Sequence, residues 1–349
     1  MKLSLLPGLA EPYAAPQAPA APAPASPQFI KLYDDSRADH GAEVATELTA
    51  GLCDAAAHVS PKYFYNPLGS SLFEAITALD EYYPTRTEAA IFSASYTQIT
   101  AALAHSGVRN PCLIDLGAGN CQKASALIPH LHPRQYVPVD ISVEFLRGAA
   151  TQMQMSYPAL DIVGLGMDFS NGLALPPEVQ AHERVFFYPG SSIGNFHPPQ
   201  ALAFLQQIAD PAHGKAAGLL LGIDLVKDEA TLEAAYDDAL GVTAAFNKNL
   251  LRYLCALLGA DFDVRRWRHV ALFNSQQSRI EMHLEAASDL IVNWPGQQKH
   301  FSAGQRIHTE CSYKYTLDGM TAMLRQAGFG HAQHWTDPNK WFAVFWAAV

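Results

Sequence analysis

The middle of the chain constrains the fold most, because short apolar runs alternate there with stretches of helical periodicity. The apolar runs predict strands at residues 112–116, 136–141, 161–169, 184–196 (ending in a loop) and 218–226. The amphipathic stretches predict helices at residues 120–131, 143–154 and 201–209. Apolar strands separated by amphipathic helices are typical of a parallel sheet covered on both faces, so we expect an α/β fold.

A different pattern begins after Val226, where helical spacing extends to residue 260. Strand-like runs follow at 269–274, 278–286 and 306–316. The chain then returns to the α/β pattern, with a helix at 317–329 and terminal strands at 331–337 and 341–349. We therefore expect residues 227–313, with part of 86–105, to form a lobe inserted before the last strands of the sheet.

The N-terminal region predicts a tail followed by helices. Residues 13–27 are rich in proline and alanine, a composition typical of an extended, solvated segment. Residues 29–105 show mostly helical spacing. We expect a disordered tail at 1–28 and a main domain formed by residues 29–226 and 314–349.

Charge and apolar content exclude several classes of protein. The formal net charge is −10 at pH 7, and an acidic surface repels phosphate groups, so we expect no nucleic-acid partner. No apolar run approaches the ~18 residues that span a membrane, and the longest contains Asp224. The first residues make a poor signal peptide because Pro7 and Glu11 interrupt the apolar stretch. We expect no membrane partner.

Five cysteines are scattered along the chain without any C-x-x-C pair. Such a distribution in an acidic protein is typical of reduced thiols, so we expect a cytoplasmic location. His130 and His132 are close in sequence, but no carboxylate or thiol lies at ligand spacing around them. We therefore expect no metal site.

The strongest local signal is the glycine-rich turn after the first predicted strand. Gly117 and Gly119 lie at the carboxyl end of this strand, where the backbone can pass close to a ligand. The third glycine of a dinucleotide fingerprint would fall at position 122, which is Gln122. This departure disfavours a nicotinamide dinucleotide and suits the amino-acid tail of S-adenosylmethionine.

Acidic residues end the next two predicted strands. Asp140 lies where a carboxylate can accept hydrogen bonds from both ribose hydroxyls, and Asp168 and Phe169 lie where an adenine ring would bind. Taken singly, a glycine-rich turn is most often only a tight turn, and a strand-end aspartate is most often a helix cap. Their occurrence at successive strand ends, in this order, favours an S-adenosylmethionine site.

Motifs spread over most of the chain carry a family resemblance. They are KYFY at 62–65 with GS at 69–70, EYYPTRTE at 81–88, YPGSSIGNF at 188–196, AY at 235–236, IEM at 280–282 and TECS at 309–312. From about residue 30 to its end, the chain resembles the histidine Nα-methyltransferases of the ergothioneine pathway. The strings at 81–88 and 188–196 are the most specific.

The resemblance implies a Rossmann-like class I methyltransferase sheet with helices on both faces and an inserted α+β substrate lobe. It implies S-adenosyl-L-methionine as methyl donor and S-adenosyl-L-homocysteine as product. The expected reaction is Nα-methylation of L-histidine, with up to three transfers giving hercynine, the first step of ergothioneine biosynthesis. We expect a monomer that acts on this small molecule.

By the same resemblance, the candidate catalytic residues are Asn195, Tyr82 and Tyr65. Asn195 would orient the acceptor amine with Tyr82 nearby, and Tyr236 from the lobe would bind the histidine carboxylate. Tyr65 and Tyr82 are expected to surround the nitrogen as it becomes a quaternary cation, because aromatic rings attract such cations. Core packing is the alternative for Tyr82 and Tyr236, and the motif match favours function.

Glu310 and Ser312 match the family positions that hold the imidazole. Residues two apart on a strand point to the same face, so both side chains can reach one ring. A charge-assisted hydrogen bond to Glu310 would contribute about 1.5–3 kcal/mol. Met282 would form a flexible apolar wall of this pocket, or simply fill the core. Cys311 stands where relatives commonly carry an aliphatic residue, and its side chain is expected to point away from Glu310.

The resemblance also implies the contacts of the methyl donor. The expected residues are Tyr65, Gly117, Lys123, Asp140, Asp168 and Phe169. Gly117 and Lys123 match positions at the methionine end, with Tyr65 close to them. Asp140 matches the ribose position. Methyl transfer needs no metal, and positioning of the two reactants can supply roughly 7–11 kcal/mol.

Two other functions stay open. One is methylation of another amino acid or amine, such as tryptophan, which Glu310 with Ser312 disfavours, because a polar pocket can reject an apolar analogue by about 10⁴–10⁵-fold. The other is a non-catalytic metabolite-binding protein on the same scaffold, which the presence of Asp140, Asn195 and Glu310 disfavours. No His or Cys base is evident for the amine, so we expect its proton to pass to water.

Overall fold

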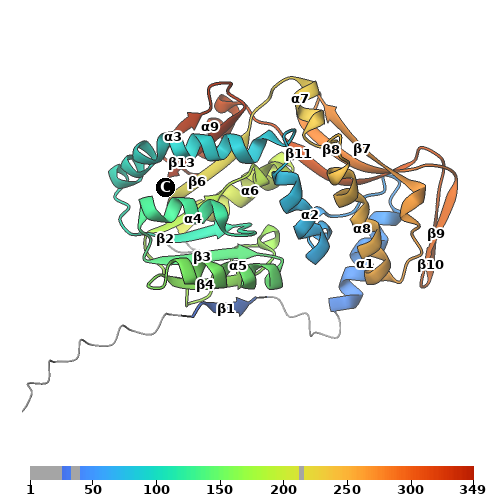
Figure 1. Ribbon diagram of the computed structural model, residues 1–349, viewed down its shortest axis with the longest axis horizontal. Coiled ribbons are helices and arrows are strands. Elements are labelled where there is room, and N and C mark those ends of the chain that lie inside the picture. Colours follow the sequence, from blue (N-terminus) through green and yellow to red (C-terminus); the bar gives the residue numbers. More distant parts are fainter. Residues whose placement is uncertain (1–25, 33–39, 212–215) are drawn as a thin grey trace, which may run out of the picture.

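The computed structural model describes residues 26–32, 40–211 and 216–349. Most of the tail expected at 1–28 therefore lies outside the described residues. Within them, a sheet with helices on both faces forms one body, and a lobe lies beside it (Figure 1). A cavity is lined by residues from both parts.

The central sheet has eight strands in the order β1-β4-β3-β2-β5-β6-β13-β12. Its strands are β1 (Gln28–Lys31), β2 (Cys112–Leu116), β3 (Gln135–Asp140), β4 (Asp161–Gly166), β5 (Arg184–Tyr188), β6 (Ala216–Asp224), β12 (His331–Thr336) and β13 (Phe342–Ala348). Strands β1 to β6 pair in parallel, while β13 is antiparallel to β6 and to β12. The predicted parallel sheet with a terminal hairpin is confirmed. The strand order and the antiparallel last strands give the Rossmann-like sheet that the resemblance implied.

The order of the strands places a switch point between β2 and β5. The chain proceeds from β2 through β3 to β4 in one direction and then returns to place β5 on the other side of β2. Ligands of such sheets bind in the crevice at the carboxyl ends of the strands beside this point. The turn at Gly117 follows β2, and the loop 189–195 follows β5.

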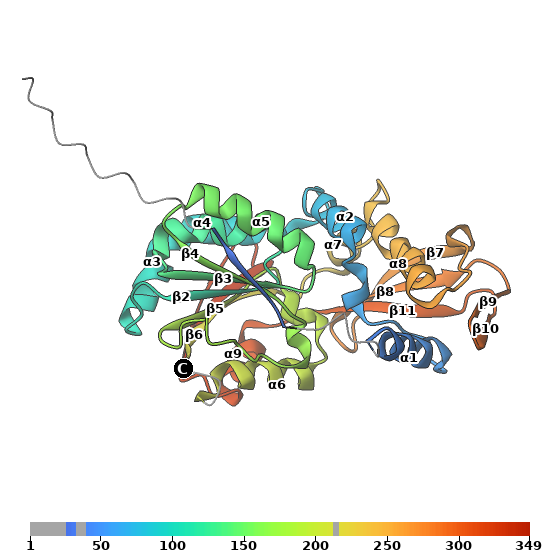
Figure 2. The ribbon, with the colours of Figure 1, turned by 90° about the horizontal axis from the view of Figure 1, so that it is seen from below.

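Helices cover both faces of the sheet, as expected. Figure 2 shows α3 (Tyr83–His105), α4 (Gln122–Leu131) and α5 (Val143–Ser156) on one side, and α6 (Pro198–Ala209) and α9 (Leu317–Gln326) on the other. The strand side chains alternate between the two layers. Leu113 belongs to the cluster packed against the first group, and its neighbour Ile114 belongs to the cluster packed against the second.

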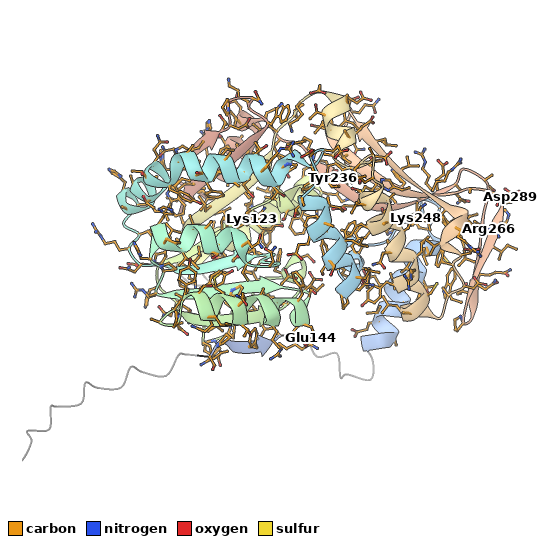
Figure 3. All side chains as sticks on the ribbon, viewed as in Figure 1. Lys123, Glu144, Tyr236, Lys248, Arg266 and Asp289 are labelled. Carbon is orange, nitrogen blue, oxygen red and sulfur yellow. The ribbon has the colours of Figure 1, made fainter. Side chains whose placement is uncertain are left out.

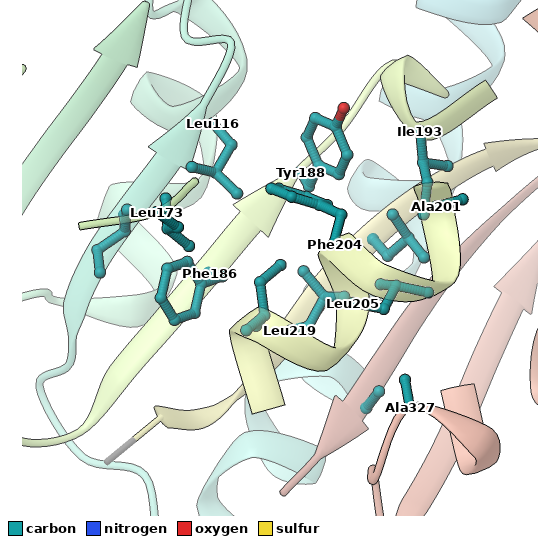
Figure 4. Close-up of a cluster of buried hydrophobic side chains, with 14 of the residues drawn as sticks. Leu116, Leu173, Phe186, Tyr188, Ile193, Ala201, Phe204, Leu205, Leu219 and Ala327 are labelled. Carbon is teal, nitrogen blue, oxygen red and sulfur yellow. The ribbon is translucent and has the colours of Figure 1, made fainter. Parts of the chain in front are cut away.

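The second of these clusters supports the loop after β5. Phe186 and Tyr188 of β5 pack with Phe204 of α6, and Tyr188 and Phe204 meet with ring centroids 5.4 Å apart (Figure 4). Ile193, in a short 3₁₀ turn (Ser192–Asn195), is fully buried in the same cluster. The apolar packing of this turn fixes the position of Asn195.

The lobe combines an antiparallel sheet with helices. Its elements are α7 (Glu229–Ala234), α8 (Val242–Leu258), β7 (Trp267–Asn274), β8 (Arg279–Ala286) and β11 (Arg306–Tyr313), with the strands in the order β11-β8-β7. A hairpin of β9 (Leu290–Trp294) and β10 (Gln297–Phe301), which the sequence pattern did not reveal, completes it.

The N-terminal segment differs most from expectation. Residues 28–31, predicted as tail end and helix, form strand β1 on the sheet edge, paired with β4. Helix α1 (His40–Cys53), a 3₁₀ turn (Pro61–Phe64) and helix α2 (Pro67–Thr77) pack on α8 and share the apolar cluster of the lobe. Helix α3 instead packs on β13 of the main sheet. We therefore propose a lobe that includes residues 40–82 as well as 227–313, without 86–105.

Candidate active site

A cavity of about 1250 Å³ lies between the carboxyl edge of the sheet and the lobe. A recess of about 50 Å³ shares walls with it, among them Tyr82, Asn195 and Glu310. All the residues predicted for the site line one or both of these spaces. The cavity is lined by Tyr65, Tyr82, Gly117, Lys123, Asp140, Asp168, Phe169, Asn195 and Glu310. The recess is lined by Tyr65, Tyr82, Asn195, Tyr236, Met282, Glu310 and Ser312.

The glycine turn after β2 presents bare backbone to the cavity. Gly117 and Gly119 have φ values of 71° and 52°, in the left-handed region that favours glycine. A Cβ atom added at either glycine would meet nothing within 4 Å, so the turn faces open space. An elongated ligand can therefore lie directly against this turn, which suits S-adenosylmethionine.

Asp140, at the end of β3, is held in place by the same turn. Its Oδ2 accepts a hydrogen bond from the Gly119 N–H at 2.9 Å, and its Oδ1 accepts one from the Ser142 N–H at 2.8 Å. Burial raises the pKa of this carboxyl, against the lowering effect of the backbone hydrogen bonds. Asp140 is thus fixed in one orientation at the edge of the cavity, as a ribose-binding carboxylate requires.

Lys123, in the first turn of α4, is oriented by a buried acid. Its Nζ lies 2.6 Å from Oε2 of Glu88, which is only 1% exposed. The other oxygen of Glu88 accepts a hydrogen bond from the Gly190 N–H at 2.8 Å. Glu88 therefore connects helix α3, helix α4 and the loop after β5. Figure 3 shows Lys123 on the sheet body and Tyr236 where the sheet body meets the lobe.

Asp168 and Phe169 follow β4 and line the cavity. Asp168 caps a short 3₁₀ turn (Phe169–Asn171) by accepting a hydrogen bond from the Ser170 N–H at 3.0 Å. The Phe169 ring meets Tyr188 edge to face, with ring centroids 5.8 Å apart. The cap and the aromatic packing hold a carboxylate and an apolar ring side by side.

Aromatic rings form the wall shared by the cavity and the lobe. Tyr65 and Tyr82 each contact Phe73, at centroid distances of 5.9 and 6.2 Å, and Tyr82 also meets Tyr236 at 6.2 Å. Burial raises the pKa of Tyr65 and of Tyr82 well above the usual range, and the nearby Glu310 carboxylate adds to this effect. Both hydroxyls are therefore neutral and available as hydrogen-bond donors at physiological pH.

Glu310 on β11 is the acid of the recess. Its strand pairs with Met282 of β8, and the register shifts between His308 and Glu310. Burial raises the pKa of Glu310 to about 7, and the Lys314 ammonium and a hydrogen bond with Asn195 partly oppose the rise. The predicted imidazole-binding and amine-binding residues are thus in direct contact.

The thiol of Cys311 was expected to point away from Glu310. It is buried and lies 3.8 Å from the main-chain oxygen of Asn195. Cys311 also lines the main cavity, although it does not line the recess.

Several residues of the site were missed at the sequence level. Lys314 is buried behind Ser312, Phe73 belongs to the aromatic wall, and Glu88 orients Lys123. Glu88 lies in the EYYPTRTE string, and Lys314 stands between Tyr313 and Tyr315, so a charge beside aromatic residues could have indicated both. Thr243 lines the recess, and its main-chain N–H donates to Oδ1 of Asp238 at 2.7 Å.

In residues 26–32, 40–211 and 216–349, no three His, Cys, Asp or Glu side chains converge as metal ligands would. None of the helices in those ranges combines the length and the apolar character of a membrane span.

Comparison with known proteins identifies the family. A model of histidine-specific, S-adenosylmethionine-dependent methyltransferases matches residues 44–349. The histidine N-alpha-methyltransferase of Mycolicibacterium smegmatis is 39% identical over 322 residues, which cover 90% of this chain and 98% of that protein. The histidine N-alpha-methyltransferase of Mycobacterium tuberculosis is 38% identical over 315 residues, which cover 86% and 94% of the two chains.

A solved structure of an S-adenosylmethionine-dependent methyltransferase from Clostridium acetobutylicum is also similar, at a TM-score of 0.43 and 11% identity, covering 74% of this chain and 92% of that one. The extent of the family match and the identity to the two mycobacterial proteins lead to one conclusion. This chain belongs to the histidine-specific, S-adenosylmethionine-dependent methyltransferases.

Proposed function

We propose that this protein transfers methyl groups from S-adenosylmethionine to the α-amino nitrogen of L-histidine, up to three times, to give hercynine. The observation that carries the proposal is the contact between Glu310 and Asn195 in a recess that shares walls with the cavity lined by the glycine turn. A carboxylate suits an imidazole N–H, and an amide oxygen suits an amine. Their proximity matches the two ends of one histidine molecule.

The methyl donor would lie along the carboxyl ends of β2, β3 and β4. The open turn at Gly117, the fixed carboxylate of Asp140 and the ring of Phe169 fit its methionine, ribose and adenine parts in that order. Lys123 would hold the methionine carboxylate. The donor supplies an electrophilic methyl group on a sulfonium sulfur. The protein supplies orientation, which can account for roughly 7–11 kcal/mol of the barrier.

The acceptor would lie in the recess. Asn195 and Tyr82 would orient the amine, and Tyr236 would bind the carboxylate, with Thr243 also on the wall of the recess. Glu310 and Ser312 would hold the imidazole against Met282. No histidine or cysteine is among the described residues that line the recess, so we propose that the amine proton passes to water.

Repeated methylation places a requirement on the walls of the site. The nitrogen gains bulk at each step and ends as a quaternary cation. Tyr65 and Tyr82 lie at the junction of recess and cavity with uncharged rings, which suits a bulky cation. We propose that these two rings accept the methylated nitrogen.

We further propose that the reaction is the first step of ergothioneine biosynthesis. The five cysteines are free thiols, which suits a reducing compartment, so we propose that the enzyme is located in the cytoplasm. We also propose that it is a monomer.

Mass spectrometry of a reaction with histidine and S-adenosylmethionine tests the proposal directly. We expect products carrying one, two and three added methyl groups. Calorimetry in the presence of S-adenosylhomocysteine tests the recess: Glu310→Ala should weaken histidine binding by roughly 10–100-fold. Glu285→Ala, which removes a carboxylate paired with Arg306 elsewhere on β8, is the matched control and should leave binding unchanged. Tighter binding of tryptophan than of histidine would overturn the substrate assignment.

A further inference from the structure

Lys314, two residues after Ser312, is a fully buried cation with three hydrogen-bond partners. Its Nζ lies 2.8 Å from Oδ2 of Asp224, 3.0 Å from the Tyr236 hydroxyl and 2.9 Å from the Ser312 hydroxyl. An ammonium group has three N–H donors and no acceptor. All three donors are therefore used, and two of them end on the hydroxyls that line the recess.

The two hydrogen bonds from Lys314 restrict the directions in which the Tyr236 and Ser312 hydroxyls can donate. The Tyr236 and Ser312 oxygens lie 2.8 Å apart, so they share one hydrogen bond, and each also accepts a bond from Lys314. The pair has two hydroxyl protons, and only one can lie between the oxygens. The other must point away from Lys314, toward the recess. The pair therefore presents a donor to any ligand, whichever of the two oxygens carries it.

A bound ligand can obtain a second donor from the same pair. If Tyr236 and Ser312 give up their mutual hydrogen bond, Lys314 still donates to both oxygens, and both protons become available to the ligand. A hydroxyl without such a cation behind it can rotate and accept instead. Lys314 occupies one of the two lone pairs on each oxygen, so each hydroxyl is biased toward donating to the ligand.

We propose that Lys314 is a positioning residue that keeps Tyr236 and Ser312 as donors, so that the site selects a neutral imidazole with its unprotonated nitrogen toward Ser312. The inference rests on the proposed function. In this arrangement Tyr236 donates to the carboxylate of the amino acid, Ser312 donates to one ring nitrogen, and Glu310 accepts from the N–H of the other. The pocket therefore recognises the N–H of the imidazole through Glu310 and its unprotonated nitrogen through Ser312.

The surroundings of Lys314 hold it in place. Asp224 is 1% exposed and pairs with both Lys314 and Lys227, at 2.8 and 2.6 Å. Burial acts to raise the pKa of Asp224, but the two ammonium groups outweigh it and hold the pKa below the usual range. Tyr83 also donates to Asp224, at 2.7 Å. The carboxylate therefore stays ionised and holds Lys314 against the two hydroxyls.

Pyrrolylalanines are the probes that isolate the acceptor nitrogen. The pyrrol-2-yl and pyrrol-3-yl isomers carry the ring N–H at one or the other histidine position and a C–H in place of the second nitrogen. Their shape and amino-acid end are those of histidine. We would measure binding of histidine and of both analogues by calorimetry in the presence of S-adenosylhomocysteine, and compare histidine with the isomer that binds better.

The wild-type protein should prefer histidine by roughly 10–100-fold, the effect of one hydrogen bond that leaves a buried donor unpaired when it is lost. Ser312→Ala and Lys314→Met should both reduce this preference to roughly threefold or less. The matched control is Lys227→Met, which removes the other buried cation on Asp224 without touching either hydroxyl. It should keep the wild-type preference, even if it lowers stability.

A purely structural role for Lys314 predicts a different result. Lys314→Met would then weaken histidine and pyrrolylalanine equally and leave their ratio unchanged, which overturns the inference. If Lys314→Met does not fold, Ser312→Ala decides alone, because an unchanged ratio in that variant also overturns it. A wild-type protein that binds no histidine would instead refute the proposed function. Histidine binding without preference over the analogue refutes only the inference.

Discussion

The Glu88 carboxylate and the Lys123 ammonium lie 2.6 Å apart, although they belong to different helices and are separated by 35 positions in the sequence. The acid is buried, whereas the lysine side chain is 37% exposed toward the cavity. The ion pair therefore holds a cation at the place where the carboxylate of the methyl donor is expected. Glu88 also binds the Gly190 N–H, so the same acid supports the loop that carries Asn195.

Glu88→Ala should lower the free energy of unfolding by roughly 1–3 kcal/mol, because it leaves the Gly190 N–H without its acceptor. Lys123 adds little to this loss, since its exposed side chain can be solvated. Chemical denaturation measures the change. Glu183→Ala removes an exposed ion pair with Arg134 and should cost no more than about 1 kcal/mol. Equal effects of the two substitutions would contradict the role given to Glu88.

Gly117→Ala should weaken binding of S-adenosylhomocysteine and destabilise the fold. The residue has a φ of 71°, a conformation that costs a residue with a side chain roughly 1–2 kcal/mol, and the added methyl group would project into the cavity. Gly148→Ala is the control, because Gly148 lies inside helix α5 with open space around it. That change should stabilise the helix by roughly 0.5–1 kcal/mol and leave binding unchanged. Calorimetry and thermal unfolding report the two effects.

Asn195→Ala should lower kcat/KM for histidine by roughly 10²-fold, because a small misplacement of the acceptor amine costs about that much. Steady-state kinetics with separate kcat and KM values tests the expectation. Asn293→Ala removes a hydrogen bond to Asp261 in the β9–β10 hairpin and should leave both constants unchanged. A rise in KM alone for Asn195→Ala would show that this residue binds the substrate without orienting the amine.

Glu310 should make the ligand-free protein less stable at alkaline pH. Its pKa is raised from an ordinary value near 4.5 to about 7, so the folded protein retains this proton while the unfolded chain loses it. Stability from this group therefore falls as the pH rises from about 5 to about 7. Glu310→Gln, which cannot ionise, should be more stable than the wild type by roughly 1–3 kcal/mol at pH 8 and equal to it at pH 4.5.

Glu285→Gln supplies the comparison of opposite sign. Hydrogen bonding to Arg306 lowers the pKa of Glu285, so its contribution is present at neutral pH and is lost as the pH falls. This substitution should destabilise the protein at pH 8 and have less effect near pH 4. Urea unfolding at a series of pH values distinguishes the two. A wild type more stable than Glu310→Gln at pH 8 would contradict the raised pKa.

Much of the sheet could be predicted because local pattern and final position agree. Strands such as β2 and β5 are buried on both faces, so their apolar runs are visible in the sequence, and the helices between them show one apolar stripe. The ends of consecutive parallel strands meet at one edge, so Gly117, Asp140 and Asp168 could be placed together. Their positions on one cavity follow from this topology, while their roles toward ligands stay predictions.

The elements that were missed have weak local signals. Strand β1 has four residues and lies on the sheet edge, so only its pairing with β4 makes it a strand. The helical spacing of α1 and α2 does not show which part of the fold these helices pack against. Only their contacts with α8, about 170 positions or more away in the sequence, place them in the lobe. Periodicity reports which face of an element is buried, but it carries no information on the partner.

The sequence by itself determined the parallel sheet, its terminal hairpin and the family of the protein, because these depend on local apolar pattern and on contiguous motifs. The tertiary structure decided how charge is arranged around the recess. Lys314 is 90 positions from Asp224 and 78 from Tyr236 in the sequence, and their contacts exist only because β6, the segment after α7 and the end of β11 meet. A buried charge is stable only with its partners in place. Because these partners come from separate segments, the role of Lys314 could not be predicted from the sequence alone.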